Sequence, residues 1–499
     1  MTVKIAESRD DWAAAAGALD LRNRAFVDGG FVDAISGETF DCVNPATGAV
    51  LTRVAACDAA DVDVAVAAAR RAFEAGVWSR AHPSKRKAVL LKLAALIREN
   101  LPELALLETL DTGKPIRDTL ATDIPGAAAY VQWFAEAIDK LYDEVAPTAP
   151  GNLALVRREP LGVVGAVVPW NFPLDMAVWK CAPALAVGNS VVLKPAEQSP
   201  LTALRFAELA HLAGVPAGVL NVLPGFGPTA GKALGLHMDV DCLAFTGSTE
   251  VGKLFQIYSG QSNLKQVWLE CGGKSPNLVF ADCDDLDRAA EMAALGIFYN
   301  QGEVCSATSR LLVERSIADA FVAKLAARAG EVRLGDPLDP ETTMGALIDE
   351  RHADRVAGYI DAGKGTARLV RGGNRVTRGA SGAFVEPTIF TDVARDAAIL
   401  REEIFGPVLC VVPFDTEEEA IALANDSIYG LAASVWTANL SRAHRVAERL
   451  KVGTVSVNTV DAVSPATPFG GFKQSGFGRD LSLHAFDKFT GLKTTWIKY

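Results

Sequence analysis

Cys305 differs from the other seven cysteines of this 499-residue chain because polar turn residues surround it. It lies in FYNQGEVCSATSR (298–310), with a glycine three residues ahead and a strand-like run behind. A nucleophilic thiol requires partial exposure and a lowered pKa, and a turn rich in backbone N–H groups supplies both. The segment therefore indicates a nucleophile that could attack a carbonyl carbon, with an unreactive turn cysteine as the alternative.

Two more polar residues follow short apolar runs and could serve the same chemistry. Glu270 lies in WLECGGKSP (268–276), where two glycines would let its carboxylate reach a water. Asn171 lies in VVPWNFP (167–173), and its amide could donate to an oxyanion together with the backbone N–H of Cys305. Spacing alone does not join these residues, since an exposed Glu and a turn Asn are ordinary features.

Glycines and small hydroxyl residues stand where a phosphate could bind. Gly227 in GFGPTAG (225–231) and Ser248 in FTGSTEVG (245–252) each lie between a strand end and a helix start. Free N–H groups at such positions hold phosphates. Lys194 and Glu197, in KPAE, could hydrogen-bond the hydroxyls of a ribose. Ordinary turns and a solvated ion pair are the alternatives.

These candidates must be positioned by an alternation of strands and helices. Two amphipathic helices are predicted first, at 59–77 and 84–110. Strands are then predicted at 161–169, 189–195, 220–225 and 242–248, with helices at 177–187, 200–213 and 228–236. Because the strands are apolar throughout, they indicate a buried parallel sheet with helices on both faces.

A second alternation of the same kind begins near residue 276. It comprises strands at 277–280, 310–314, 408–414, 432–437 and 454–458, with helices at 284–299, 316–332, 350–363, 416–425 and 440–450. The last residues, GLKTTWIKY, form an alternating strand without a partner nearby, and such a strand often pairs with another subunit.

The composition excludes several classes of protein. Hydrophobic residues make up 49% and charged residues 22%, which is typical of a globular chain. The net charge of −11 argues against a nucleic-acid partner, and no uninterrupted apolar run suits a membrane span. The N-terminus lacks the apolar core of a signal peptide, so we expect a cytoplasmic protein. The eight cysteines form no CxxC pair, and only six histidines are present. We therefore expect no metal site.

A resemblance to a known family joins the separate motifs. WLECGGKSP followed by FYNQGEVC resembles the paired signature of the aldehyde dehydrogenase superfamily. PWNFP, KPAEQSP, FTGSTEVG, EEIFGPV (402–408) and PFGGFKQSGFGRD (468–480) are similar to its other blocks, in the same order. Residues 123–140, VFADCDDLDRA and residues 479–494 resemble the branch that oxidises γ-glutamylaminobutyraldehyde and related ω-amino or guanidino aldehydes.

The resemblance implies a role for each matching residue. Cys305 would be the nucleophile, Glu270 the general base for hydrolysis, and Asn171 part of the oxyanion hole. The implied cofactor contacts are Lys194 and Glu197 to the adenosine ribose, Trp170 and Ser248 to the pyrophosphate region, and Glu403 and Phe405 to the nicotinamide ribose and ring. A carboxylate at the ribose repels a 2′-phosphate, so we expect NAD, with NADP use less favoured.

A tunnel for a cationic aldehyde would have acidic and aromatic walls. The candidates are Asp175, Met176, Trp179, Asp461 and Phe469, with Tyr130 and Trp133 on an earlier helix. Loop 459–468 has an Asp and no basic residue, which favours a neutral or cationic aldehyde. The alternatives are a broad-specificity aliphatic or betaine-aldehyde-type dehydrogenase, a CoA-acylating relative that Glu270 argues against, and a non-catalytic protein with the same fold.

The expected architecture is α/β, with two Rossmann-like parallel-sheet domains and a small β element for oligomerisation. Residues 1–140 and 161–269 would form the NAD-binding domain, and residues 270–480 the catalytic domain. Residues 141–160 and 481–499 would form the oligomerisation element of a homodimer or homotetramer.

Overall fold

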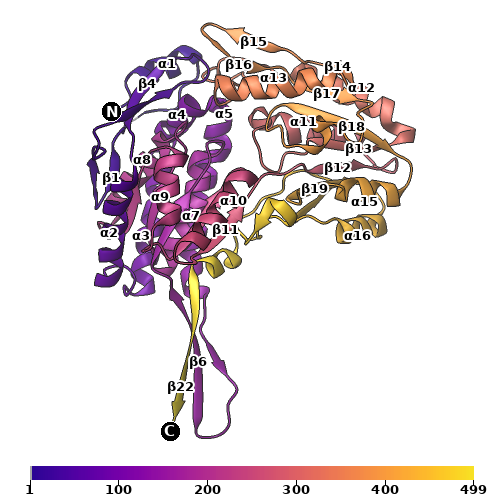
Figure 1. The fold of residues 1–499 in the computed structure, drawn as a ribbon. Coiled ribbons are helices and arrows are strands. Elements are labelled where there is room, and N and C mark those ends of the chain that lie inside the picture. Colours follow the sequence, from indigo (N-terminus) through magenta and orange to yellow (C-terminus); the bar gives the residue numbers. More distant parts are fainter. Residues whose placement is uncertain (1–2) are drawn as a thin grey trace.

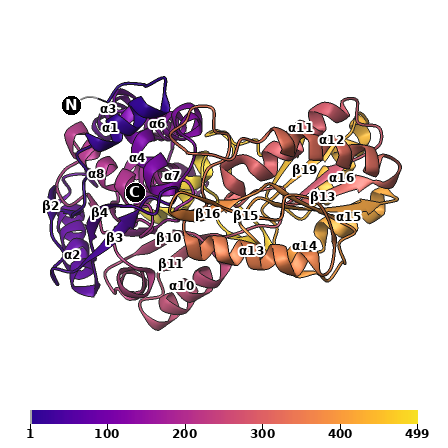
Figure 2. The same ribbon diagram turned by 90° about the horizontal axis from the view of Figure 1, so that it is seen from above.

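The structure, a computed structural model, describes residues 3–499. Two sheets lie side by side, each covered by helices, and a narrow β arm projects from the body (Figure 1; Figure 2). The predicted α/β class with two mainly parallel sheets is confirmed. No helix among the described residues is long and apolar enough to cross a membrane.

The first sheet has eight strands in the order β2-β1-β9-β8-β7-β10-β11-β21. They are β1 (Ala25–Val27), β2 (Gly30–Val32), β7 (Val163–Val167), β8 (Ser190–Lys194), β9 (Leu220–Val222), β10 (Cys242–Thr246), β11 (Gln266–Glu270) and β21 (Gly476–Phe477). The five central strands are parallel. The chain proceeds from β7 to β8 and β9 in one direction, and then from β10 to β11 in the other. The strand order therefore reverses between β7 and β10, which is where open α/β sheets bind ligands.

The helices of this half cover both faces of the first sheet. They are α1 (Arg9–Gly17), α2 (Ala59–Ala75), α3 (Pro83–Glu99), α4 (Leu101–Thr112), α5 (Ile116–Asp118), α6 (Ile124–Ala137), α7 (Pro173–Val187), α8 (Leu201–Ala213), α9 (Lys232–Leu236) and α10 (Thr249–Gln261). Val164 and Ala166 of β7 pack in a core with α3, α6, α7 and α8. Val163 and Val167 of the same strand face a second core with α2, α9 and α10. This alternation explains why the strands read as continuous apolar runs.

Two predicted helices proved wrong in their extent. The segment 84–110 is divided into α3 and α4 at Asn100, because Pro102 stands in the first turn of α4. Proline has no N–H to donate and its ring clashes with the preceding turn, so it begins a helix more readily than it continues one. The predicted helix 228–236 is likewise divided into a π-helical turn, Gly227–Gly231, and α9.

The second sheet has seven strands in the order β14-β17-β18-β13-β12-β19-β20. They are β12 (Pro276–Val279), β13 (Arg310–Glu314), β14 (Arg368–Arg371), β17 (Thr388–Thr391), β18 (Val408–Phe414), β19 (Ala432–Trp436) and β20 (Thr454–Val457). Its helices are α11 (Leu286–Phe298), α12 (Ala318–Glu331), α13 (Glu350–Lys364), α14 (Ala398–Arg401), α15 (Glu417–Asn425) and α16 (Leu440–Arg449). All strands except β14 run parallel.

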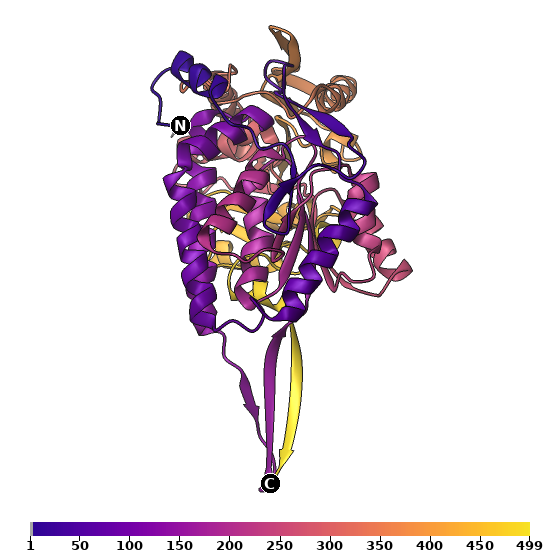
Figure 3. The ribbon, with the colours of Figure 1, turned by 90° about the vertical axis from the view of Figure 1, so that its left-hand side faces the viewer.

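The projecting arm consists of β5 (Glu144–Ala146), β6 (Asn152–Pro160) and β22 (Thr490–Lys498). The C-terminal strand was predicted to have no partner nearby in the sequence, and its partner is the distant strand β6, with which β22 pairs antiparallel over its whole length. Periodicity in one segment does not reveal a partner more than 300 residues away. The arm extends away from the body with the C-terminus at its tip, as Figure 3 shows from the side.

Small elements complete the fold. β3 (Thr39–Val43) with β4 (Val50–Ala55), and β15 (Arg375–Arg378) with β16 (Ser381–Val385), form two-stranded sheets. β21 comes from the far end of the chain, yet it pairs with β11 of the first sheet. The end of β11, where Glu270 lies, is therefore flanked by β10 and by a strand from near the C-terminus.

Candidate active site

The predicted site residues gather at the carboxyl edge of the first sheet. Lys194 and Glu270 are the last residues of β8 and β11. Trp170 and Asn171 follow β7, and Ser248 follows β10. Because these strands are parallel, their carboxyl ends meet at one edge. The two segments with Trp170 and Ser248 flank the point where the strand order reverses.

A left-handed turn precedes Cys305. Asn300, Gln301 and Gly302 have φ values of 47°, 56° and 75° in succession, a conformation that costs energy for residues other than glycine. Side chains hold the turn in place, since Asn300 Nδ2 donates to the Asn171 carbonyl at 3.0 Å. Gln301 Oε1 accepts from the Gly345 N–H at 3.0 Å. This turn brings the Cys305 loop against the end of β7.

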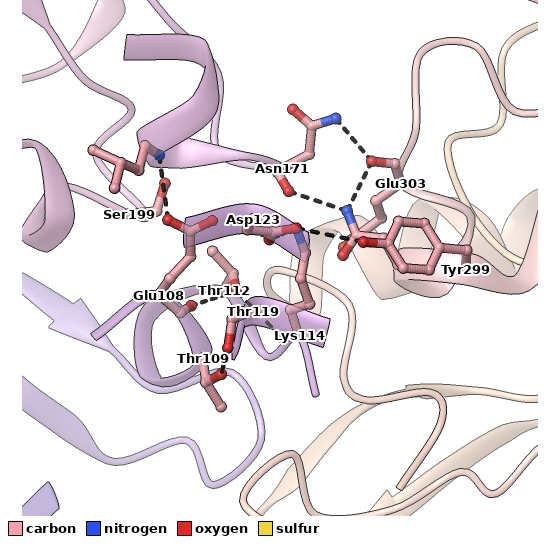
Figure 4. A network of polar contacts seen from close by, with 12 residues as sticks. Glu108, Thr109, Thr112, Lys114, Thr119, Asp123, Asn171, Ser199, Tyr299 and Glu303 are labelled. Atoms are coloured by element: carbon pink, nitrogen blue, oxygen red, sulfur yellow. Dashed lines mark hydrogen bonds and ion pairs between the residues drawn. The ribbon is translucent and has the colours of Figure 1, made fainter. Parts of the chain in front are cut away.

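Asn171 is bonded directly to that loop. Its side-chain Nδ2 donates to the Glu303 carbonyl at 2.8 Å, two residues before Cys305 (Figure 4). Asn171 is 5% exposed. A side-chain amide has two N–H groups, so the second remains available to a developing oxyanion. The geometry suits the predicted role of Asn171.

Cys305 differs from the expected reactive cysteine in one respect. Its thiol is half-buried, and desolvation raises its pKa, as do the carboxylates of Asp461, Glu403 and Glu270. The backbone N–H of Ser306 lowers the pKa but does not outweigh these effects. The expectation of a lowered pKa is wrong for this form of the protein, because carboxylates surround the turn. A base must therefore accept the thiol proton.

Glu270 is suited to that task. Its side chain is buried, and within residues 3–499 neither carboxylate oxygen has a hydrogen-bond partner. Burial and the nearby Asp480 carboxylate raise its pKa well above the ordinary value, against the opposing charges of Lys180, Lys488 and Arg479. A carboxylate with a raised pKa is a better proton acceptor near neutral pH. An unpartnered one is free to bond a water or a thiol.

Two glycines after Glu270 allow three site residues to approach one another. The Gly273 N–H donates to Glu403 Oε1 at 2.9 Å. A Cβ on Gly272 would lie 1.9 Å from Glu403 Oε2, and one on Gly273 would lie 2.5 Å from the Cys305 carbonyl oxygen. No larger residue fits either position unless its neighbours move. Burial raises the pKa of Glu403 to about 7.

The predicted cofactor residues form two groups. Lys194 Nζ bonds Glu197 Oε2 at 3.0 Å, and the Gly227–Gly231 turn passes beside the Lys194 side chain. Burial lowers the pKa of Lys194, while Glu197 opposes this shift. Ser248 caps α10 by accepting the Val251 N–H at 3.3 Å, which leaves the first N–H groups of that helix directed toward the edge of the sheet.

The second group is aromatic. Trp170 packs edge-on against Phe405, with ring centroids 5.3 Å apart, and His352 lies 5.4 Å from Trp170. Phe405 has a left-handed backbone with φ of 61°, and its carbonyl is bonded to His352 Nε2 at 2.7 Å. The site thus has an ion pair that can bind hydroxyls, a helix start that can bind phosphate, and a flat aromatic wall. Together these features fit a dinucleotide bound where the strand order reverses.

The predicted tunnel residues form three groups. Trp179 packs between Tyr130 and Phe469, at centroid distances of 5.6 and 5.3 Å. Asp461 Oδ1 accepts the hydroxyl of Ser306, the residue after Cys305, at 2.6 Å. Asp175 and Met176 are buried in the first turn of α7. Of these two, Asp175 belongs to a separate buried network of carboxylates.

That network was not predicted from the sequence. Asp123 pairs with Lys114, accepts from the Tyr299 hydroxyl at 3.4 Å, and lies near Glu108 (Figure 4). Glu108 Oε2 accepts the Leu174 N–H at 3.2 Å, which fixes the start of α7 just after Asn171.

Comparison with known proteins decides the family. A profile described as the aldehyde dehydrogenase family matches residues 31–495. This chain belongs to the aldehyde dehydrogenase family. It is 56% identical to the NADP/NAD-dependent aldehyde dehydrogenase PuuC of Escherichia coli (strain K12) over 486 residues, covering 97% of this chain and 98% of PuuC. The resemblance stated from the motifs is thereby confirmed.

Two solved aldehyde dehydrogenases share the fold closely. One is the γ-glutamyl-γ-aminobutyraldehyde dehydrogenase of Burkholderia cenocepacia J2315, with a TM-score of 0.97 and 60% identity over 98% of this chain and 99% of that one. The other is a mutant of the indole-3-acetaldehyde dehydrogenase AldA of P. syringae in complex with NAD+ and IAA, with a TM-score of 0.98. It is 59% identical, over 99% of this chain and 100% of that one.

Some residues of this aldehyde dehydrogenase escaped the sequence reasoning although signals were present. Lys180 interrupts an otherwise apolar stretch of α7, and a lone charge in such a helix indicates a buried partner. Asn300 and Gln301 stand before Gly302, and Asn readily adopts the left-handed conformation next to glycine. No local pattern marks Lys114 or Asp123, whose partners come from distant segments.

Proposed function

We propose that this aldehyde dehydrogenase oxidises ω-amino, guanidino or γ-glutamylamino aldehydes to carboxylic acids with NAD as the preferred cofactor. The name of the Burkholderia enzyme supports this substrate class, and that of PuuC supports a reaction that depends on NAD or NADP. The observation that carries the proposal is the excess of buried carboxylates beside the predicted tunnel. Three of them, Glu108, Asp123 and Asp175, interact with one ammonium group, that of Lys114, which pairs with Asp123.

The arrangement leaves the carboxylates short of positive charge. Among residues 3–499, Glu108 Oε1 and Asp175 Oδ1 have no hydrogen-bond partner. Lys114 is committed to Asp123 and to the face of Phe172, with its Nζ 3.7 Å from the ring centroid. Burial raises the pKa of Glu108 and Asp175 well above their ordinary values. A cationic group that enters the site would supply the missing charge and favour their ionised forms.

Asp461 and the aromatic row support the same substrate class. The Asp461 carboxylate lies beside the residue that follows Cys305, so it contributes negative charge close to the nucleophile. Tyr130, Trp179 and Phe469 form an aromatic wall that could accept an ammonium or guanidinium group by cation–π contact.

The proposed reaction begins with addition of the Cys305 sulfur to the aldehyde carbon. The thiol proton passes to Glu270 as the C–S bond forms, and the oxyanion is held by the Asn171 amide and the Cys305 backbone N–H. NAD, when bound, supplies the acceptor for the hydride that the thiohemiacetal carbon gives up. Glu270 then releases the thiol proton to solvent and accepts a proton from the water that attacks the thioester carbon. The C–S bond breaks, the acid leaves, and Glu270 returns its proton to the Cys305 sulfur.

The proposed contacts for NAD use the residues at the edge of the first sheet. Lys194 and Glu197 would hold the adenosine ribose, and Gly227, Trp170 and Ser248 would lie along the pyrophosphate. Glu403 and Phe405 would position the nicotinamide ribose and ring. A carboxylate at position 197 favours free ribose hydroxyls over a 2′-phosphate, which supports NAD over NADP.

A substrate panel tests the proposal. We expect kcat/KM with NAD to be at least about tenfold higher for 3-aminopropionaldehyde and 4-guanidinobutyraldehyde than for neutral aldehydes of equal length, because a buried charge pair discriminates strongly. Asp175→Asn should remove this preference and leave propionaldehyde turnover nearly unchanged, whereas exposed Asp392→Asn should alter neither. Equal efficiency with neutral aldehydes would favour the broad-specificity or betaine-aldehyde alternative. A higher efficiency with indole-3-acetaldehyde would favour an aromatic substrate, as in the name of AldA.

We further propose a homodimer or homotetramer assembled through the arm, in the cytoplasm. β22 is the edge strand of the arm, and Leu492 and Trp496 are 65% and 66% exposed. Exposed apolar side chains on a free strand edge favour pairing with another subunit. All eight cysteines are free thiols, which supports a reducing compartment.

A further inference from the structure

Behind Glu270 lies a buried cluster of three charged residues from separate elements. Lys180 belongs to α7, Asp480 follows the loop that leads from Phe469, and Lys488 ends the 3-10 helix Leu483–Lys488. Their side chains are 1%, 0% and 3% exposed. Charged groups are buried in this way only where partners compensate for the loss of water.

Asp480 has two cationic partners. Lys180 Nζ donates to one of its carboxylate oxygens, and Lys488 Nζ donates to the other. Its backbone is fixed by two hydrogen bonds of 2.8 Å to Phe469. The cluster thus contains two ammonium groups and one carboxylate, so it carries one excess positive charge in a region without water access. Asp480 and a single lysine would already form a neutral buried pair, so the second lysine is not needed to neutralise Asp480.

Glu270 is the group that balances the excess charge. Gly470, beside Phe469 in the same loop, lies so close that a Cβ would be 2.7 Å from Glu270 Oε1. Two lysines and two carboxylates together are neutral. The remaining nearby cation, Arg479, donates to the carbonyls of Gly471 and Gly478 and stacks over Phe472, so it forms no ion pair with Asp480.

We infer that Lys488 is a positioning residue for thioester hydrolysis, which orients Asp480 and supplies the positive charge that keeps Glu270 ionised as a base. The inference rests on the proposed role of Glu270. Lys180 alone would neutralise Asp480 and leave the Glu270 charge uncompensated. The lysine contributed by the segment just before β22 therefore completes the catalytic centre without contact with the substrate.

Every charged group that faces Glu270 bears on its titration. Asp480 raises the Glu270 pKa, while Lys180, Lys488 and Arg479 lower it. Glu270 in turn raises the pKa of Cys305 and of Cys271, and Glu403 acts on both thiols. Removal of Lys488 eliminates one of three cations, so the pKa of Glu270 rises and the protonated acid persists to higher pH.

The test is the pH profile of steady-state turnover with NAD and propionaldehyde. In Lys488→Met the acidic limb of the profile should move to higher pH by about one unit. At pH values on the acidic side of the limb, kcat should be about tenfold lower than in the wild type, and at high pH the two should be equal. Lys488→Arg should keep the limb near its original position. Lys493→Met removes an exposed lysine of β22 and should change nothing. A Lys488→Met profile that coincides with the wild-type profile would overturn the inference.

A stability cycle gives a second measurement. Loss of Lys488 leaves the cluster one charge negative, loss of the Glu270 charge leaves it one charge positive, and loss of both restores neutrality. The double variant Glu270→Gln/Lys488→Met should therefore melt at a higher temperature than the two single shifts predict, even where Lys488→Met alone folds poorly. A melting temperature of the double variant equal to or lower than the sum of the two single shifts predicts would contradict the inference.

Failure of the proposed function is distinguishable from failure of this inference. Glu270→Gln should slow the first-turnover burst of NADH and abolish subsequent turnover, because Glu270 accepts both the thiol proton and the proton of the hydrolytic water. If Glu270→Gln leaves turnover intact, the base is misassigned. A second outcome is that Glu270→Gln abolishes turnover, while Lys488→Met has the wild-type pH profile and the shifts in melting temperature are additive. In that case the assignment of Glu270 as the base is retained and the proposed role of Lys488 is wrong.

Discussion

The Cys305 thiol lies among negative charges rather than positive ones. Asp461, Glu403 and Glu270 all raise its pKa, which favours the protonated form of this proposed nucleophile. Such a thiol resists oxidation, because the thiolate is the reactive species. Activation then depends on transfer of the proton to a carboxylate, and Glu270, with its raised pKa and unpartnered oxygens, is the acceptor that the geometry favours.

Asn171→Ala should slow hydride transfer about 100- to 1,000-fold, because one oxyanion donor contributes roughly 3–4 kcal/mol in such sites. The fold should survive, since Asn300 Nδ2 still donates to the Glu303 carbonyl at 3.2 Å. Single-turnover formation of NADH measures the effect. NAD affinity serves as the control and should not change. A burst rate equal to that of the wild type would exclude Asn171 from the oxyanion hole.

Glu403→Gln should impair use of NAD in a pH-dependent way. Burial raises the Glu403 pKa to about 7, so the wild-type group is protonated below that pH and ionised above it. A charged acceptor binds ribose hydroxyls more strongly, so kcat/KM for NAD in the wild type should exceed that of the variant about tenfold near pH 8 and approach it near pH 6. The Gln side chain can still accept the Gly273 N–H. A ratio independent of pH would contradict the assignment.

Some residues of the site could be predicted from the sequence and others could not. Cys305, Glu270 and Asn171 could be selected because each follows a strand or precedes one in an unusual polar turn. Glu108 and Asp123 could not, because each lies in a helical segment where an acidic residue normally faces water. Burial of such a residue depends on segments that meet only in three dimensions.

At the scale of elements, the left-handed turn before Cys305 should be intolerant of substitution. Gly302→Ala would strain a residue with φ of 75° and place a Cβ 2.3 Å from the Gly406 carbonyl oxygen. We expect a loss of about 2–5 kcal/mol in the free energy of unfolding, together with loss of activity. Gly358→Ala is the matched control, since its Cβ would meet open space within α13. It should stabilise by roughly 0.5–1 kcal/mol. Urea titration measures both, and equal effects would contradict the role of the turn.

The alternation of strands and helices was visible in the sequence because the central strands are buried on both faces. Several of the strands that were missed obey different rules, although the buried strand β17 was missed as well. β14, β15 and β16 are short strands at a sheet edge or in a hairpin, and several of their side chains face water. Their pattern does not differ from that of a loop. The arm was recognised only in part, since β6 is mostly half-buried and its partner is the last strand of the chain.

At the scale of the molecule, the arm should determine assembly. Leu492 and Trp496 lie on the same face of β22, because side chains alternate along a strand. Trp496→Asp should shift the sedimentation of the protein from the proposed dimer or tetramer toward smaller species, since a charge in an apolar contact is costly. Thr495→Asp, on the opposite face, should have a smaller effect. Assembly of the Trp496→Asp variant identical to that of the wild type would show that the arm is not the interface.

The pairing of β21 with β11 has a consequence for biosynthesis. The proposed nucleophile, base and oxyanion donor all leave the ribosome before the short strand Gly476–Phe477 that closes the sheet beside Glu270. Asp480 and Lys488 follow later still. A nascent chain therefore possesses every proposed reacting group while its catalytic pocket is still open to water. A premature stop codon near the end of the message would give a chain that has these groups but lacks the segment that closes the pocket.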